Sequence, residues 1–210
     1  ARACGFCDYC KSGRGNLCRK TIMLGSASTT PPTDGAYAEF VKKNDYASGI
    51  ELASQSSNVI VTRTFSKLYG LAGLRVGWGY GPQHIIDVLN RVRGPFNISA
   101  PALAAGEAAV RDHDFVIQHR AQNNAARAYL AEELAALGVA SDPSDANFLL
   151  ARFASQEQAE ACDDHLQSLG ILVRRVGSYG LPQCLRITVP EMAGCARVVQ
   201  GVRGFLEQTA

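Results

Sequence analysis

The chain has 210 residues, with 21 basic and 19 acidic side chains and a formal net charge of +2. This balance gives no basic field for nucleic acid or a membrane surface, and no apolar run approaches the roughly 20 residues that span a bilayer. A hydrophobic content of 47% allows a real core in one or two domains. The start at Ala1 is neither an initiator Met nor a secretory signal, which predicts a cytoplasmic chain that is processed or a fragment.

Four of the seven cysteines are clustered in the first eighteen residues, at Cys4, Cys7, Cys10 and Cys18. Such a cluster in a chain without a secretion signal indicates metal ligands in a reducing compartment. Four thiolates favour a closed, tetrahedral and therefore structural zinc site. An iron–sulfur cluster is the alternative, but its usual last spacing is three residues, not seven. The remaining cysteines are predicted to be small buried side chains: Cys162, Cys184 and Cys195.

The segment from Cys4 to Cys18 resembles the structural-zinc lobe of medium-chain zinc alcohol and polyol dehydrogenases, and the resemblance extends to about residue 40. The rest of the chain lacks the glycine fingerprint of a nicotinamide-binding domain and has no catalytic-zinc set. Its isolated histidines are predicted on solvated helix faces: His84, His113, His119 and His165. We therefore predict that residues 1–33 form a structural-zinc lobe without dehydrogenase chemistry.

The next segments are a polar, proline-interrupted linker over residues 26–33 and then, after Asp34–Val41, a strand over residues 58–63. Lys67 lies where this strand ends, and burial there would lower its pKa and make it a nucleophile toward a carbonyl. The Ser66 hydroxyl and the Arg75 guanidinium could hold a phosphate. A nucleophilic amine beside a phosphate cradle indicates pyridoxal phosphate held as a Schiff base. The alternative is a surface lysine in a glycine-rich loop before a second strand.

The motif from Ser66 to Arg75 resembles the cofactor-lysine motif of histidinol-phosphate aminotransferases, which are fold-type I pyridoxal phosphate enzymes. The similarity runs from about Asp34 to the C-terminus. It implies that Lys67 holds the cofactor and acts as general base, and that Ser66 and Arg75 bind its phosphate. It also implies that Asp34 contacts the pyridine nitrogen and keeps it protonated, and that Tyr37 contacts the ring hydroxyl.

The octapeptide Asp34–Val41 suits the dehydrogenase and the aminotransferase families at once. We therefore hypothesise that the chain is a chimera joined there, with a natural two-domain protein as the alternative. The aminotransferase family has a long N-terminal half before this point, which supplies further walls of the cofactor site, sheet strands and dimer contacts. Its replacement predicts unpaired sheet edges and reduced or absent activity.

The remainder alternates helices and strands in the order of the aminotransferase small domain. Helices are predicted over 84–93, 101–110, 112–137, 156–169 and 194–207, and strands over 146–153, 171–174 and 184–189. The predicted fold is α/β: an incomplete, mainly parallel large-domain sheet with helices over 34–111, then an α+β small domain over 112–210.

Three residues in this part are implied by the resemblance to bind substrate. Asn147 would lie on the substrate carboxylate side, Arg186 would clamp the α-carboxylate, and Arg174 would meet a substrate phosphate. The alternatives are a polar strand start for Asn147 and a surface charge for Arg174. Pro190 stands where the family pattern favours glycine, and its fixed φ and missing donor predict a misdirected loop beside Arg186.

The first hypothesis is therefore a pyridoxal phosphate-dependent aminotransferase of histidine biosynthesis, acting on an imidazole-bearing amino phosphate and a 2-oxo acid as a homodimer. The second is a non-catalytic, zinc-stabilised chimeric chain that binds a partner through its exposed sheet. A zinc-dependent polyol dehydrogenase ranks third.

Overall fold

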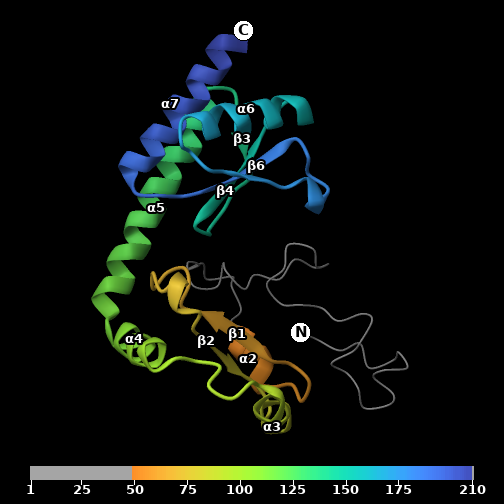
Figure 1. Ribbon diagram of the computed structural model, residues 1–210, viewed down its shortest axis with the longest axis vertical. Coiled ribbons are helices and arrows are strands. Elements are labelled where there is room, and N and C mark those ends of the chain that lie inside the picture. The colour runs from red at the N-terminus through yellow and green to blue at the C-terminus, as the bar shows by residue number, and fades with distance from the viewer. Residues whose placement is uncertain (1–48, 210) are drawn as a thin grey trace. The chain divides into compact units, whose positions relative to one another are not determined.

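The computed structural model describes residues 49–209 (Figure 1). They fall into two compact units that divide between Val116 and Ile117, and each is described by itself. The predicted zinc lobe, with Cys4, Cys7, Cys10 and Cys18, lies outside the described residues, as do Asp34 and Tyr37.

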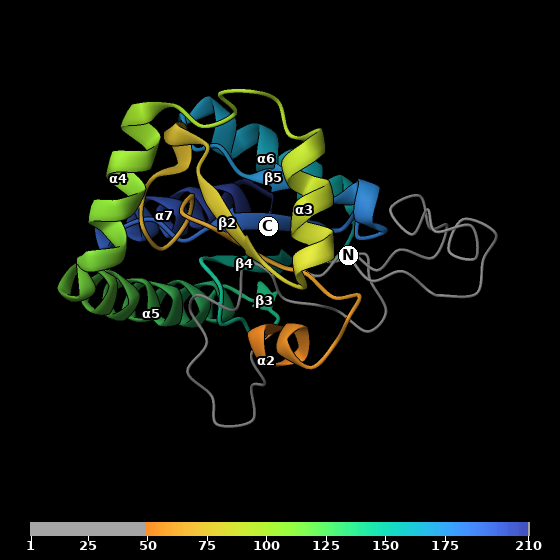
Figure 2. The same cartoon turned by 90° about the horizontal axis from the view of Figure 1, so that it is seen from below.

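The first unit contains short strands and helices that surround the Lys67 segment. Its elements are α2 (Gly49–Ser54), β1 (Val61–Thr64), the 3-10 helix η3 (Ala72–Leu74), β2 (Gly77–Tyr80), α3 (Gln83–Val92), α4 (Ala100–Arg111) and the start of α5 (His113–Ala136). Figure 2 shows β2 in projection between α4 and α3. Ser99 caps α4, since its hydroxyl accepts the Ala102 amide at 3.3 Å, and Pro101 stands in the first turn, as its sequence position predicts.

The sheet of the first unit is antiparallel, with Val61 opposite Tyr80 and Thr64 opposite Gly77. The prediction of a mainly parallel sheet was therefore wrong for the strands that the structure describes. Parallel neighbours need a long crossover connection, usually an α-helix. The segment between β1 and β2 contains only the single 3-10 turn η3, so the chain reverses and pairs back on itself.

The second unit is a four-stranded antiparallel sheet packed against helices. Its elements are most of α5, then β3 (Ala140–Ser141), β4 (Phe148–Arg152), α6 (Gln156–Ser168), β5 (Arg174–Arg175), the 3-10 helix η4 (Gly177–Tyr179), β6 (Cys184–Thr188) and α7 (Met192–Thr209). The strand order is β3-β4-β6-β5. Figure 1 shows α6 and α7 beside β4 and β6.

The core of the second unit lies between one face of this sheet and the helices. Leu149 of β4 is paired with Ile187 of β6, and both are buried with Leu134 of α5 and Leu166 of α6 in one apolar cluster. Successive side chains of a strand point to opposite faces of a sheet. Leu150 of β4, Arg186 of β6 and Arg174 of β5 are cross-strand partners and therefore lie on the second face, which we call the open face. The cysteines predicted as small buried side chains are confirmed as buried: Cys162, Cys184 and Cys195.

The helix ends of the second unit follow the sequence closely. Gly138 and Gly170 have φ values of 80° and 72°, the left-handed conformation that glycine adopts after a helix. The predicted strand over 171–174 is shorter in the structure, where only Arg174 and Arg175 pair. The amide of Ile171 is used instead in the capping of α6, because it donates to the Leu166 carbonyl at 2.9 Å. Among the described residues no helix is long and apolar enough to cross a membrane.

Candidate active site

The Lys67 segment is a closed loop between β1 and β2. The Phe65 amide donates to the Val76 carbonyl at 3.1 Å, and the Leu71 amide donates back to the Phe65 carbonyl at 2.9 Å. The side chains of Phe65 and Val76 are buried against Ala102 of α4. These bonds and contacts fix both ends of the loop.

Lys67 itself is exposed, although its neighbour Leu68 is only 1% exposed. The prediction that Lys67 is buried at the strand end was therefore wrong for the described residues. The strand ends at Thr64, and the turn closed by the Gly70 amide on the Lys67 carbonyl, at 2.9 Å, directs Leu68 inward instead. The amine of Lys67 is thus accessible to a carbonyl compound.

Ser66 and Arg75, nine residues apart, lie together beside Lys67. Arg75 Nη1 is 3.5 Å from Ser66 Oγ, a long hydrogen bond, and donates to the Ala72 carbonyl at 2.9 Å. Arg75 has φ 52° and ψ 42°, a left-handed conformation that is uncommon outside glycine. This backbone geometry costs free energy, and such residues cluster at ligand-binding sites.

The donor set around Lys67 suits a phosphorylated aldehyde. A guanidinium is a planar, permanent cation that binds phosphate, and the Ser66 hydroxyl can donate beside it. The exposed amine of Lys67 lies on the same loop. The residues described here therefore fit pyridoxal phosphate, with Lys67 toward the aldehyde and Ser66 and Arg75 toward the phosphate.

A second group of predicted site residues lies on the open face of the four-stranded sheet. Arg174 of β5 and Arg186 of β6 are direct cross-strand partners, and Leu150 of β4 is the partner of Arg186 on its other side. Like charges placed directly opposite each other repel. An anion between the two guanidinium groups would relieve this repulsion, so the pair forms a candidate anion site.

The Nε atom of Arg186 is buried and has no hydrogen-bond partner among the described residues. Its guanidinium carbon lies 5.4 Å from the centre of the Phe148 ring, a cation–π distance. A buried donor without a partner costs free energy unless a ligand accepts from it. This observation favours a ligand at Arg186.

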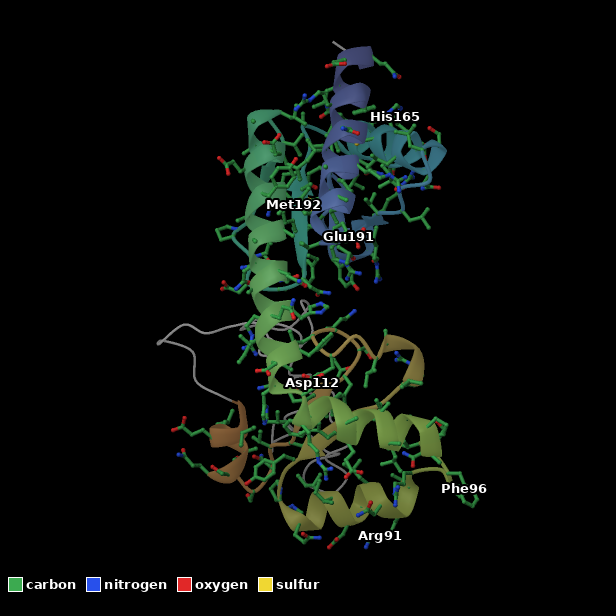
Figure 3. The ribbon with its side chains drawn as sticks, turned by 90° about the vertical axis from the view of Figure 1, so that its left-hand side faces the viewer. Arg91, Phe96, Asp112, His165, Glu191 and Met192 are labelled. Carbon is green, nitrogen blue, oxygen red and sulfur yellow. The ribbon has the colours of Figure 1, made fainter. Side chains whose placement is uncertain are left out.

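The structure places Asn147 immediately before β4, next to the end of β6. The Val189 amide donates to the Asn147 carbonyl at 2.9 Å, so the backbone ladder continues up to the residue before Pro190. Glu191 and Met192 follow at the start of α7 (Figure 3). The misdirection of this loop by Pro190 stays a prediction.

Tyr179 in η4 is a residue that sequence reasoning missed. Arg174 Nη2 donates to Tyr179 Oη at 3.3 Å, and the Arg174 guanidinium carbon lies 5.7 Å from the centre of the ring. The available signal was the turn sequence Gly-Ser-Tyr-Gly shortly after Arg174, which can bring the ring back to the strand.

Other kinds of candidate site in residues 49–209 would be a pocket, a group of metal ligands or an isolated histidine. A pocket of about 340 Å³ at the end of β2 is lined by Tyr80, Pro82 and a serine-rich turn, and it contains no predicted site residue. No group of three or more His, Cys, Asp or Glu side chains in this part of the chain could hold a metal ion. The isolated His165 lies near the Phe205 ring, with centroids 6.0 Å apart, on α6 (Figure 3).

Comparison with known proteins identifies the family. The profile of the family "Aminotransferase class I and II" matches residues 27–202, most of the chain. The chain belongs to this family. Its membership agrees with the exposed lysine, hydroxyl and guanidinium on one loop, because aminotransferases of this kind use a lysine and a phosphorylated cofactor.

Relatives within the family are named as histidinol-phosphate aminotransferases. The protein from Dinoroseobacter shibae is 60% identical over 177 residues, which are 84% of this chain and 48% of that protein. The protein from Cereibacter sphaeroides strain KD131 is 59% identical over 193 residues, 92% of this chain and 53% of that protein. The aminotransferase chain thus spans about half the length of the curated relatives it matches.

A solved structure shows the same fold. The histidinol-phosphate aminotransferase from Sinorhizobium meliloti, in complex with pyridoxal 5′-phosphate, has a TM-score of 0.78 and 30% identity, covering 83% of this chain and 48% of that one. The fold is therefore a partial pyridoxal phosphate-dependent aminotransferase fold. The 193-residue alignment to the Cereibacter protein must begin upstream of Asp34. The chimeric join near Asp34–Val41 receives no support from these relatives and stays a hypothesis.

Proposed function

We propose that this chain carries part of a histidinol-phosphate aminotransferase, in which Lys67 holds pyridoxal phosphate and an amino group passes between an imidazole-bearing amino phosphate and a 2-oxo acid. The observation that carries the proposal is the loop of the first unit, where Ser66 and Arg75 meet beside the exposed Lys67. The identity of about 60% to relatives of that name supports the substrate class.

The roles of the loop residues follow from their chemistry. Bound pyridoxal phosphate supplies an electron sink that stabilises negative charge at the substrate α-carbon. Lys67 is the amine that binds the cofactor and, once free, the base that moves the α-proton. Ser66 and Arg75 bind the phosphate. Asp34 would keep the pyridine nitrogen protonated and Tyr37 would contact the ring hydroxyl, as the family resemblance implies.

The open face of the second unit is the proposed substrate-binding surface. Arg186 would bind the α-carboxylate of the 2-oxo acid, because its buried Nε lacks a partner in the described part of the chain. Arg174, directly opposite on β5, would bind the substrate phosphate. Asn147 would lie on the carboxylate side. Two guanidinium groups side by side suit a substrate or substrate pair with anionic groups.

Half of the relatives' length has no counterpart in these 210 residues. We therefore expect reduced or absent turnover from these residues alone, because positioning groups supply much of the rate. We propose the homodimer of the family for the whole protein.

Cofactor binding can be tested without turnover. The chain is mixed with pyridoxal phosphate, reduced with borohydride and digested, and the labelled peptide is identified by mass spectrometry. We expect the label on Lys67, its loss in Lys67→Ala, and its retention in the matched control Lys43→Ala. Weaker binding is expected in Arg75→Gln. Equal labelling of several lysines in the wild type, with no saturation, would refute the proposal.

The cysteine cluster supports a second proposal, a structural zinc bound by Cys4, Cys7, Cys10 and Cys18. Its basis is the sequence alone: four thiolates in a closed set. About one zinc per chain is expected by metal analysis, falling in Cys7→Ser but not in the control Cys195→Ser. A non-catalytic, zinc-stabilised chain is supported if zinc binds and pyridoxal phosphate does not.

A further inference from the structure

The two arginines of β5 lie on opposite faces of the four-stranded sheet. Arg174 pairs with Arg186, and Arg175 pairs with Leu185. Cross-strand partners share a face, and neighbours along a strand alternate. Arg175 is therefore on the helix face with the buried Leu185, whereas Arg174 is on the open face with Arg186.

Arg175 is held by acidic side chains of α6. Its Nε donates to Asp163 Oδ2 at 2.5 Å, and its Nη2 donates to Asp164 Oδ1 and to the Glu160 carbonyl, the latter at 3.2 Å. The Glu160 carboxylate lies 3.9 Å from Nη1. Hydrogen bonding to Asp163, followed by the attraction of the neighbouring carboxylates, raises the pKa of Arg175. One side chain of the strand thus binds along a full turn of α6.

Asp163 differs from the other acidic partners because it is buried. Its side chain is only 5% exposed, whereas that of Asp164 is 71% exposed. A buried carboxylate is unfavourable unless a cation or donors compensate it, whereas exposed ion pairs contribute little. Gln167 Nε2 also donates to Asp163 Oδ2, at 3.0 Å. The contact between Asp163 and Arg175 therefore anchors β5.

This anchor matters because the backbone of β5 is fixed by few strand hydrogen bonds in the part of the chain that the structure describes. The strand has two residues and, among the strands that the structure describes, it lies at the edge of the sheet and pairs only with β6. Fixing the backbone at Arg175 fixes the adjacent Arg174, whose guanidinium then reaches the Tyr179 hydroxyl on the open face.

We propose that Asp163 and Arg175 are a positioning pair, which acts through β5 to hold Arg174 in place for the phosphate monoester of the substrate. This rests on the proposed function, in which Arg174 meets that phosphate. Neither Asp163 nor Arg175 touches the substrate. Both act from the helix face of the sheet.

Two variants separate positioning from simple stabilisation. Arg175→Gln leaves the Asp163 carboxylate buried without its cation, so this variant is expected to unfold at lower urea concentration. The double variant Arg175→Gln with Asp163→Asn removes the buried charge as well, so most of the lost stability returns. The anchor is absent in both. Arg203→Gln is the matched control, because it removes another arginine ion pair, with Glu133, away from β5.

The experiment measures binding of L-histidinol phosphate to the whole chain loaded with pyridoxal phosphate, and deuterium exchange of peptides covering 171–179. In the double variant we expect binding weaker by about tenfold or more, since the hydrogen bond between Arg174 and the charged substrate phosphate is lost. We also expect faster exchange of the peptides covering 171–179. Arg203→Gln should match the wild type in both measurements.

Wild-type binding in the double variant, unchanged exchange over 171–179, or equal weakening by Arg203→Gln would each overturn the inference. A wild-type chain that binds no histidinol phosphate overturns the proposed function instead. The exchange of 171–179 then still decides whether Asp163 and Arg175 fix β5.

Discussion

Replacement of Gly77 by alanine should open the sheet that closes the Lys67 loop. A Cβ at this position would lie 2.5 Å from the Arg63 carbonyl oxygen and 3.6 Å from the Thr64 Cα. Ordinary contact begins near 3.4 Å, so β1 and β2 must separate by roughly 0.9 Å at this point. The obstacle is backbone, which cannot move away by a change of rotamer.

The expected cost of Gly77→Ala is about 1–3 kcal/mol, the range for forcing an extra methyl group into a packed site. With a typical urea dependence, this lowers the unfolding midpoint of the first unit by roughly 1 M. Trp78 is the only tryptophan of the chain and lies on β2 opposite Arg63, so its fluorescence reports on this sheet.

The matched control is Gly94→Ala, because a Cβ there would meet nothing within 4 Å and no positive φ is required. Its midpoint should stay the same or rise slightly. If Gly77→Ala unfolds with the wild-type midpoint, the close approach of the two strands is not as the structure shows it, and the reasoning fails.

Further predictions concern the second unit. Leu134→Ala should destabilise it by about 2–5 kcal/mol in urea unfolding, because Leu134 is fully buried, whereas Leu172→Ala, at an 83% exposed site, should have little effect. Ser155→Ala should cost about 1 kcal/mol, since its hydroxyl accepts the Gln158 amide at the start of α6; an unchanged thermal midpoint would contradict this role. Burial raises the pKa of Cys162 from 9.0 to about 12. The folded state therefore disfavours the Cys162 thiolate. The stability that comes from burying the neutral thiol is fully present below pH 9.0 and is lost as the pH rises toward about 12. The loss should be smaller in Cys162→Ala, measured as the urea midpoint against pH, and an identical pH profile would refute it.

The helices and most strands of the described chain could be predicted from local patterns. The predicted helix over 84–93 is observed as α3, Gln83–Val92, and the predicted helix over 156–169 as α6, Gln156–Ser168. Apolar periodicity marks one side of each helix, and in α6 that side contains the buried Cys162 and Leu166, whereas α3 has no fully buried residue. Gly170 marks the end of α6 because it adopts a positive φ. The two-residue strand β3 was missed, since so short a segment has no periodicity of its own.

The candidate site includes features that local sequence patterns do not predict. The order Ser66, Lys67 and Arg75 indicated a phosphate cradle, and the structure brings Ser66 and Arg75 within 3.5 Å. The exposure of Lys67 was not predicted, because it depends on which neighbours fill the space around the loop. Tyr179 and Asp163 were also missed, since their partners are reached only through the fold.

The sequence by itself determined the family and the residue types of the site, because a short motif with a lysine, a serine and an arginine keeps its chemistry wherever it is placed. Only the tertiary structure decided that Arg174 and Arg186 are cross-strand partners and that Arg175 faces α6. The physical reason is register. A shift of one residue between β5 and β6 would exchange the two faces, and hydrogen bonds between distant segments fix that choice.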